Sequence, residues 1–142
     1  MQNAVMYFKQ ARANPRKVWY TGSTALIKGQ GMCYDLDVNS GSKAATDKDA
    51  ARGNFVEVPS SSNSRAFAGV TAQAYSAKTG GQFIEIWEPG SVCEVAALHA
   101  TTVNVTMLTC GIGSAIGGRF TLGGFKGRGS ALALQTRAAA TG

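Results

Sequence analysis

The stretch that decides the fold lies at residues 80–91 and reads GGQFIEIWEPGS. Between Gln82 and Trp87 its polar and apolar residues alternate, as on a β-strand that buries one face. The two glycines before this run are typical of a hairpin turn. After the run, Pro89 fixes the φ angle and Gly90 accepts a positive φ, which together make a strong turn. The stretch therefore predicts one strand that is bounded by a turn at each end.

Short runs of the same kind occur on both sides of this strand, separated by Gly, Asn, Ser and Pro residues. They predict further strands at residues 17–20, 25–28, 31–37, 54–58, 66–75, 92–96 and 103–109, with a surface turn at 59–64. The one helical candidate is a turn or two at residues 46–52, inside a polar loop. We therefore predict a mainly β fold, which is a small antiparallel sandwich or barrel.

The length of 142 residues suits a single domain. Within it we distinguish an extended N-terminal arm at residues 1–17, a β core at 18–110 and a Gly/Ala-rich C-terminal extension at 111–142. Eight glycines lie among the 19 residues from 111 to 129. Because each glycine loses much backbone freedom on folding, this segment has little independent reason to order. We expect it to be either a flexible loop or a segment that is fixed by contact with a partner.

Charge is divided along the sequence rather than spread evenly. The chain has a net charge of +6, with five bases and no acid in residues 1–34 and four bases and no acid in residues 95–142. All eight acids lie in residues 35–94, together with five bases. Two basic flanks thus enclose an acidic middle. This layout suits binding to nucleic acid or to an acidic protein surface, or self-assembly in which the ends of one copy contact the middle of another.

The sequence contains no catalytic or cofactor-binding constellation. The glycines at residues 111–117 have the wrong spacing for a dinucleotide loop, and no acid follows Glu94 to bind a ribose. A Ser-His-Asp triad would depend entirely on His99, the single histidine. Glu85 and Glu88 would point to opposite faces of a strand, so they do not predict a carboxylate pair. We therefore expect a protein that is not an enzyme, with no catalytic residues and no cofactor.

The cysteines and the apolar segments indicate a reduced, soluble protein. Cys33, Cys93 and Cys110 are odd in number and form no CxxC pair, so we expect buried thiols rather than disulfides or a zinc site. Residues 95–118 carry no formal charge, but they are too polar for a membrane span. The apolar patch at residues 4–8 is too short for a secretory signal. We expect no metal site and no membrane partner.

Four short motifs in the middle of the chain occur in an order that is found in a known family. They are KGQGMCYD at residues 28–35, FVEVP at 55–59, AFAGV at 66–70 and GGQFIEIWEPGS at 80–91. This order resembles that of small tailed-bacteriophage head-decoration proteins, which are also called capsid cement proteins. In that family a strand pair precedes a hairpin of the same type. The resemblance spans residues 28–95.

The resemblance implies a β-rich structural protein that is not an enzyme and that binds the outer surface of an expanded phage capsid. It implies a homo-oligomer, commonly a trimer or dimer, with the major capsid protein as its partner. Such a protein braces the junctions between capsomers against the pressure of packaged DNA. It would be made in the host cytoplasm and located on the capsid surface of the virion.

We expect the contacts with neighbouring subunits to lie mainly in the two basic flanks, where aromatic and basic residues occur together. Arginines there would meet carboxylates of the partner, and backbone pairing at strand edges would add affinity. The predicted interface residues are Tyr7, Phe8, Arg12, Arg16, Trp19, Arg119, Phe120, Phe125, Lys126 and Arg128.

Two other functions fit parts of the sequence. A carbohydrate- or receptor-binding β module of a phage tail or fibre would use Trp19, Tyr75 and Trp87 as stacking surfaces. A single-strand nucleic-acid binder would use the basic and aromatic flanks, and its affinity would fall steeply with salt. Because the bases are sparse and no RNA-binding motif is present, we do not expect nucleic acid as a partner.

Overall fold

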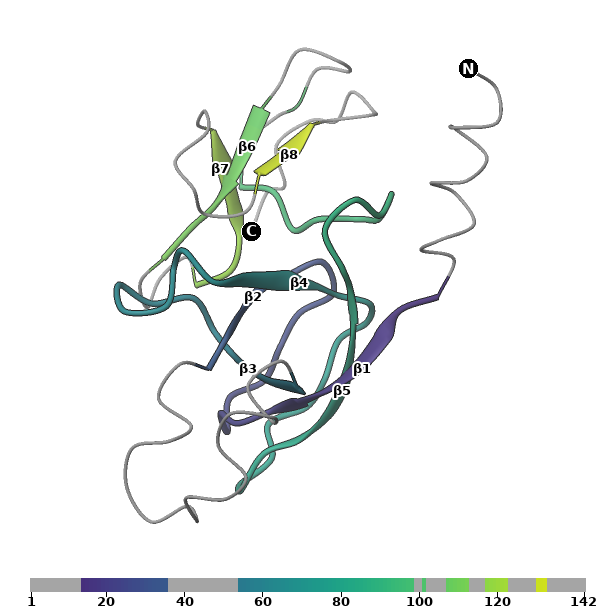
Figure 1. The fold of residues 1–142 in the computed structure, drawn as a ribbon, viewed down its shortest axis with the longest axis vertical. Helices are drawn as coiled ribbons and strands as arrows, with labels where there is room; N and C mark the ends of the chain where they lie inside the picture. Colours follow the sequence, from purple (N-terminus) through teal and green to yellow (C-terminus); the bar gives the residue numbers. More distant parts are fainter. Residues whose placement is uncertain are drawn as a thin grey trace.

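The computed structural model describes residues 14–35, 54–98, 101, 107–112, 117–122 and 130–132. These residues form eight strands and no α-helix, which confirms the prediction of a mainly β fold (Figure 1). The strands are β1 (Arg16–Tyr20), β2 (Gly31–Tyr34), β3 (Phe55–Glu57), β4 (Phe67–Thr71), β5 (Gln82–Trp87), β6 (Met107–Cys110), β7 (Phe120–Leu122) and β8 (Ser130–Leu132). The predicted helical turn at residues 46–52 lies outside the described residues.

Five strands close into a barrel in the order β1-β3-β2-β4-β5. Neighbouring strands are antiparallel except for β1 and β3, which run parallel with Trp19 opposite Phe55. The predicted barrel is therefore present, but it is mixed rather than wholly antiparallel. Its longest pairing joins β1 to β5, with the register running from Arg16 opposite Ile86 to Tyr20 opposite Gln82.

The barrel interior is filled by apolar side chains from alternate strand positions. Val18 and Tyr20 of β1 and Ile84 and Ile86 of β5 are each exposed by 2% or less. The alternation that predicts the strand at residues 82–87 therefore also identifies its buried face. Because the interior is filled, the outer surface of the barrel is the place to look for a binding site.

The remaining strands form a three-stranded antiparallel sheet in the order β7-β6-β8. This sheet lies at one end of the molecule, beside β2 and β4 (Figure 1). Its buried residues Leu108, Cys110 and Phe120 form an apolar cluster with Val70 of β4. The shared cluster joins the small sheet to the barrel.

The backbones of the barrel and the small sheet come very close where Gly31 meets Gly118. The amide of Gly31 donates a hydrogen bond to the carbonyl oxygen of Gly118 at 2.6 Å. Beside it, the Gln30 side chain donates to the carbonyl oxygen of Gly117 at 2.8 Å. A Cβ atom on Gly118 would collide with the carbonyl oxygen of Gly31. A glycine is therefore needed at this position, where two backbones meet.

Two predicted strands are not formed. Residues 25–28 contribute only one isolated bridge. Residues 92–96 form no strand, because Ala96 donates a hydrogen bond to Gly29 of the barrel and accepts one from Phe120 of the small sheet. This segment crosses between the two parts of the fold, so its backbone pairs with both in turn rather than with one strand.

The boundaries of the predicted arm and extension also differ from the structure. Arg16 and Lys17, which the sequence places in the arm, are the first residues of β1. Strands β7 and β8 lie beyond residue 110, so the folded part continues into the Gly-rich segment. In the part of the chain that the structure describes, no helix is both long enough and apolar enough to cross a membrane.

Candidate binding face of the barrel

Four of the ten predicted interface residues belong to the described part of the chain. Arg16 and Trp19 are on β1, whereas Phe120 begins β7 and Arg119 directly precedes it. The predicted interface is therefore divided between the two parts of the fold. The other six residues lie outside the described residues, and they are Tyr7, Phe8, Arg12, Phe125, Lys126 and Arg128.

Arg16 is engaged within its own chain. Its Nη1 atom donates to Glu88 Oε1 at 3.0 Å in a half-exposed salt bridge, and its Nη2 atom donates to Asn54 Oδ1 at 2.9 Å. The hydrogen bond with Glu88 raises the pKa of the Arg16 guanidinium. Because this pair links the start of β1 to the turn after β5, Arg16 has a structural role in the barrel.

Phe120 is a core residue, and its prediction as an interface residue is wrong. The residue is 1% exposed, and its ring meets Phe67 edge to face with the centroids 6.3 Å apart. The physical reason is the pairing of β7 with β6, which turns the Phe120 ring into the apolar cluster beside β4. The neighbouring Arg119 is half-buried, and its carbonyl oxygen accepts a hydrogen bond from the amide of Gly111 at 2.8 Å.

Trp19 belongs to an outward face of the barrel that we call the aromatic face. This face consists of Lys17, Trp19, Phe55, Phe83 and Glu85, from strands β1, β3 and β5. Trp19 lies opposite Phe55 on one neighbouring strand and opposite Phe83 on the other, so three rings form a row across three strands. Phe83 is 60% exposed. A large aromatic ring with this exposure, next to other rings, marks a contact surface.

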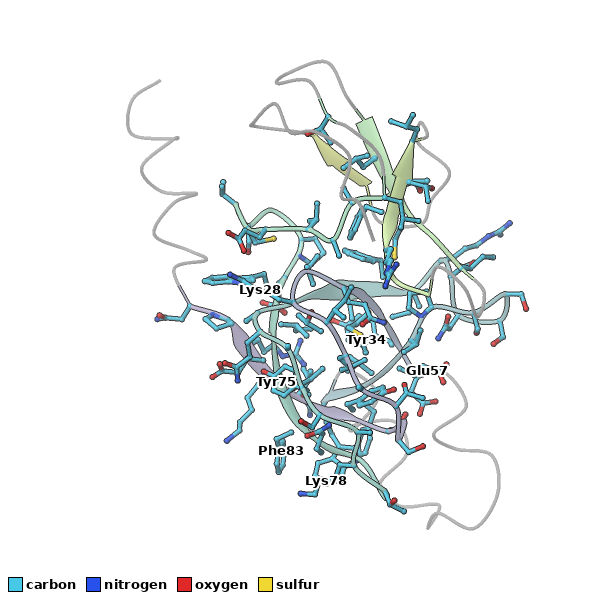
Figure 2. All side chains as sticks on the ribbon, turned by 180° about the vertical axis from the view of Figure 1, so that it is seen from behind. Lys28, Tyr34, Glu57, Tyr75, Lys78 and Phe83 are labelled. Carbon is cyan, nitrogen blue, oxygen red and sulfur yellow. The ribbon has the colours of Figure 1, made fainter. Side chains whose placement is uncertain are left out.

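The members of the aromatic face contact one another. Trp19 and Phe83 meet edge to face, with ring centroids 4.8 Å apart and an interplanar angle of 85°. The Nζ atom of Lys17 lies 5.2 Å from the centroid of Phe83, which is a cation–π distance. Figure 2 shows Phe83 at the end of the molecule that is remote from the small sheet. These contacts fix the position of an exposed ring.

A depression of about 370 Å³ lies within this surface. It is lined by Lys17, Trp19, Phe55 and Phe83 of the aromatic face, together with Val18 and Asn54. Most of its wall is thus apolar, and its one formal charge is the ammonium group of Lys17. Such a surface can stack on a flat ligand or accept a protein partner.

The aromatic face carries one charge of each sign. Lys17 and Glu85 lie opposite each other on β1 and β5, and both are exposed. Neither side chain forms an ion pair with the residues that the structure describes. Their charged groups are therefore available to a partner.

Tyr75 and Trp87, the other two residues of the carbohydrate-binding alternative, do not line the depression. Tyr75 packs against the barrel core, and its hydroxyl accepts a hydrogen bond from the amide of Glu85 at 2.7 Å. Trp87 is half-buried, and its carbonyl oxygen lies where a Cβ atom on Gly69 would be. Of the three proposed stacking residues, Trp19 alone belongs to the aromatic face.

The three thiols are free, and their environment disfavours ionisation. Burial raises the pKa of Cys33 and of Cys110 to about 12 and also raises the pKa of the half-buried Cys93. Because the thiolate is the form that attacks electrophiles and binds metals, the raised pKa values disfavour such chemistry at neutral pH. Across the described segments, no three His, Cys, Asp or Glu side chains gather where they could hold a metal ion.

The sequence prediction included Trp19 but missed the rest of the aromatic face. The signal lies in residues 82–87, where Ile84 and Ile86 take the buried positions and Phe83 falls among the exposed ones. An aromatic residue on the polar side of an alternating strand is an exposed ring, and it becomes a candidate contact surface only where other rings lie beside it. The row itself could not be foreseen, because it depends on the pairing of β1 with both β3 and β5.

The candidate site is thus an outward aromatic face with a shallow depression, on a barrel whose interior is filled by its own side chains. No protein-family model, no curated protein and no solved structure matches this chain.

Proposed function

We propose that this chain is a structural virion protein that binds the outside of a phage capsid and stabilises the shell as a decoration, or cement, protein. Its partner would be the major capsid protein, and its location would be the capsid surface, after synthesis in the host cytoplasm. The first support for this proposal is the resemblance of residues 28–95 to head-decoration proteins.

The observation that carries the proposal is the way in which the resembling motifs fit together in the barrel. The motif at residues 66–70 supplies most of β4, the motif at 80–91 contains β5, and these strands are neighbours. Where they meet, a Cβ atom on Gly69 would collide with the carbonyl oxygen of Trp87. The motifs that carry the resemblance are therefore assembled in one barrel, and Gly69 within them is a position that the barrel geometry requires.

The distribution of charge along the sequence suggests how the protein would attach to the capsid. The basic flanks contain Arg12, Arg119 and Arg128, which are the candidates to meet carboxylates on the capsid. Arg16 is a weaker candidate, because its guanidinium already pairs with Glu88. Since exposed ion pairs are screened by salt, attachment through the flanks would weaken as the ionic strength rises.

Co-sedimentation with expanded, DNA-free capsids of the phage that encodes the chain tests the proposal. The full-length protein is expected to sediment with the capsids. A variant that lacks residues 1–13 keeps Arg16, its salt bridge with Glu88 and all of β1, so it is expected to keep the same melting temperature but to stay in the supernatant. A full-length protein that does not bind would contradict the function, whereas a truncated protein that binds normally would contradict only the role of the arm.

The second candidate function is a carbohydrate- or receptor-binding module, and the depression beside Trp19 is the observation that favours it. A glycan array probed with the full-length protein would then give a signal that Trp19→Ala removes. Trp87→Ala is the matched control, because Trp87 does not line the depression. Retained binding in the control and lost binding in the Trp19 variant would favour this function over shell binding.

A further inference from the structure

The aromatic face of Lys17, Trp19, Phe55, Phe83 and Glu85 has the properties of a surface that pairs with a copy of itself. We propose that two chains dimerise through this face, with a twofold axis that lies between the two barrels. The proposal goes beyond shell binding and does not depend on it. It is argued from the exposed rings, from the strand register and from the two charges of the face.

The apolar part of the face gives the driving force. Phe83 is 60% exposed, although its ring is already fixed by edge-to-face contact with Trp19. Ordering this side chain in a dimer would therefore cost little conformational entropy, while burial of the rings would be favourable. The face is carried by neighbouring strands of one sheet, and such faces pack onto each other with their strands nearly aligned.

The strand register makes the face complementary to itself. Lys17 lies opposite Glu85, and Trp19 lies opposite Phe83, on the adjacent strands β1 and β5. The proposed twofold axis runs parallel to β1 and β5. It lies in the plane between the two facing barrels, above the line midway between the two strands. It places β1 of one copy over β5 of the other at the same level. Lys17 then faces the second copy's Glu85 and Trp19 faces its Phe83, and each contact occurs twice, as an isologous interface requires.

The balance of charge makes the aromatic face a better contact between two copies than the rest of the surface. Each chain has a net charge of +6, so two chains repel each other in general. The aromatic face is neutral overall, because it holds one lysine and one glutamate. Within a single chain the ammonium of Lys17 lies over the Phe83 ring, and neither charge has an ion-pair partner among the described residues. Both charges are therefore available to the second copy.

Charge reversal tests the proposal at positions that are exposed and away from the core. In the dimer, the K17E substitution would place a carboxylate beside the Glu85 carboxylates of both copies. The E85K substitution would place an ammonium group beside the Lys17 ammonium groups of both copies. Sedimentation velocity should give the wild type the mass of two chains, and each single variant should dimerise about tenfold more weakly or not at all. A wild type that stays at the mass of one chain would overturn the proposal, and so would single variants that dimerise as well as the wild type.

Mixing the two single variants separates an effect on the interface from an effect on the fold. In a mixed dimer every carboxylate of the K17E chain faces an ammonium group of the E85K chain. The mixture should therefore recover the mass of two chains, and the double variant K17E/E85K should recover it alone. If neither the mixture nor the double variant dimerises, the assigned pairing is wrong.

A third variant tests the apolar part of the face. Phe83→Ala should weaken dimerisation about tenfold or more, because it removes the most exposed ring of the contact. Val92→Ala is the matched control, since Val92 is 75% exposed but lies outside the face. Equal effects of the two substitutions would contradict the proposed contact.

Discussion

Gly80 and Gly81 are adjacent residues with nearly the same backbone conformation, at φ values of +84° and +88°. They differ in the space around them. A Cβ atom on Gly80 would meet no atom within 4 Å, whereas one on Gly81 would lie 2.5 Å from the Tyr20 carbonyl oxygen and 2.8 Å from Trp19 Nε1. The pair therefore separates the cost of a left-handed backbone from the cost of a steric clash.

We predict that Gly80→Ala lowers the free energy of unfolding by about 1 to 2 kcal/mol, the cost of a left-handed conformation for a residue with a Cβ atom. Gly81→Ala should lower it by about 1 to 3 kcal/mol more, because its Cβ atom also meets the backbone of β1. Urea denaturation of both variants measures the difference. Equal losses would contradict the close approach of Gly81 to Tyr20.

The buried thiols predict a loss of stability in alkaline solution. An unfolded cysteine ionises near pH 8.5, whereas burial raises the pKa of Cys33 and Cys110 to about 12. Between these values the unfolded chain binds fewer protons than the folded chain, so the free energy of unfolding falls as the pH rises. Urea midpoints from pH 7 to 11 should fall less steeply for Cys33→Ala/Cys110→Ala than for the wild type. If the urea midpoints of the variant and the wild type fall equally with pH, these thiols do not contribute to the loss of stability.

At the scale of single residues, burial along a regular strand could be predicted, but burial in turns and loops could not. The alternation of residues 82–87 identifies Ile84 and Ile86 as core residues. The run of small polar residues at 59–64 does predict a turn. However, it does not reveal that Asn63 is 1% exposed and accepts a hydrogen bond from the Ser60 amide at 2.7 Å. Which of several similar residues becomes buried depends on contacts that are distant in sequence.

At the scale of elements, a buried polar group of β4 adds hydrogen bonds to the apolar cluster that joins the small sheet to the barrel. The Thr71 hydroxyl donates to the carbonyl oxygen of Ile27 at 2.7 Å and accepts from the amide of Gln30 at 2.9 Å. The Gln30 side chain in turn bonds to Gly117. Thr71 thus holds the loop that contacts the small sheet.

We predict that Thr71→Val lowers the free energy of unfolding by about 1 to 3 kcal/mol, because it leaves the Ile27 carbonyl and the Gln30 amide without this buried partner. Thr79→Val, at an exposed turn position, is the matched control and should change it by less than about 0.5 kcal/mol. Chemical denaturation of both variants checks the prediction. An equally small effect of the two substitutions would contradict the role of Thr71.

Elements with a clear two-residue period were predicted well from the sequence, and those that cross between parts of the fold were not. Strands β3 and β5 lie where the alternation places them, and β1 lies at the short run predicted for residues 17–20. The segment at residues 92–96 is apolar enough for a strand, but its backbone bonds are divided between the barrel and the small sheet. The parallel pairing of β1 with β3 was also unforeseen, since periodicity indicates which face is buried and not which strand is the neighbour.

The Gly-rich segment shows why composition alone misplaced part of the candidate site. Its glycines and bases predicted a segment that depends on a partner, and this prediction included Phe120 as an interface residue. The glycine at position 118 instead allows the backbone to approach Gly31, and Phe120 enters the core. The aromatic face, by contrast, needed the register of three strands before its members could be recognised.

At the scale of the whole molecule, the protein is a filled barrel, and all of the proposed contacts lie on its outer surface or in its basic flanks. A dimer that forms through the aromatic face would leave the basic flanks of both copies to bind a capsid. The two proposals are separable, because K17E and E85K change the contact between copies, while the deletion of residues 1–13 changes only the arm.

The most direct test of the proposed capsid-decoration function is the amount of this protein in purified virions of the phage that, on this proposal, encodes it, measured by quantitative mass spectrometry. The expected result is a constant ratio to the major capsid protein in every preparation, and a lower ratio after washing at high salt because the proposed attachment is electrostatic. Absence from the virion, or an amount that follows the tail proteins rather than the capsid protein, would contradict it.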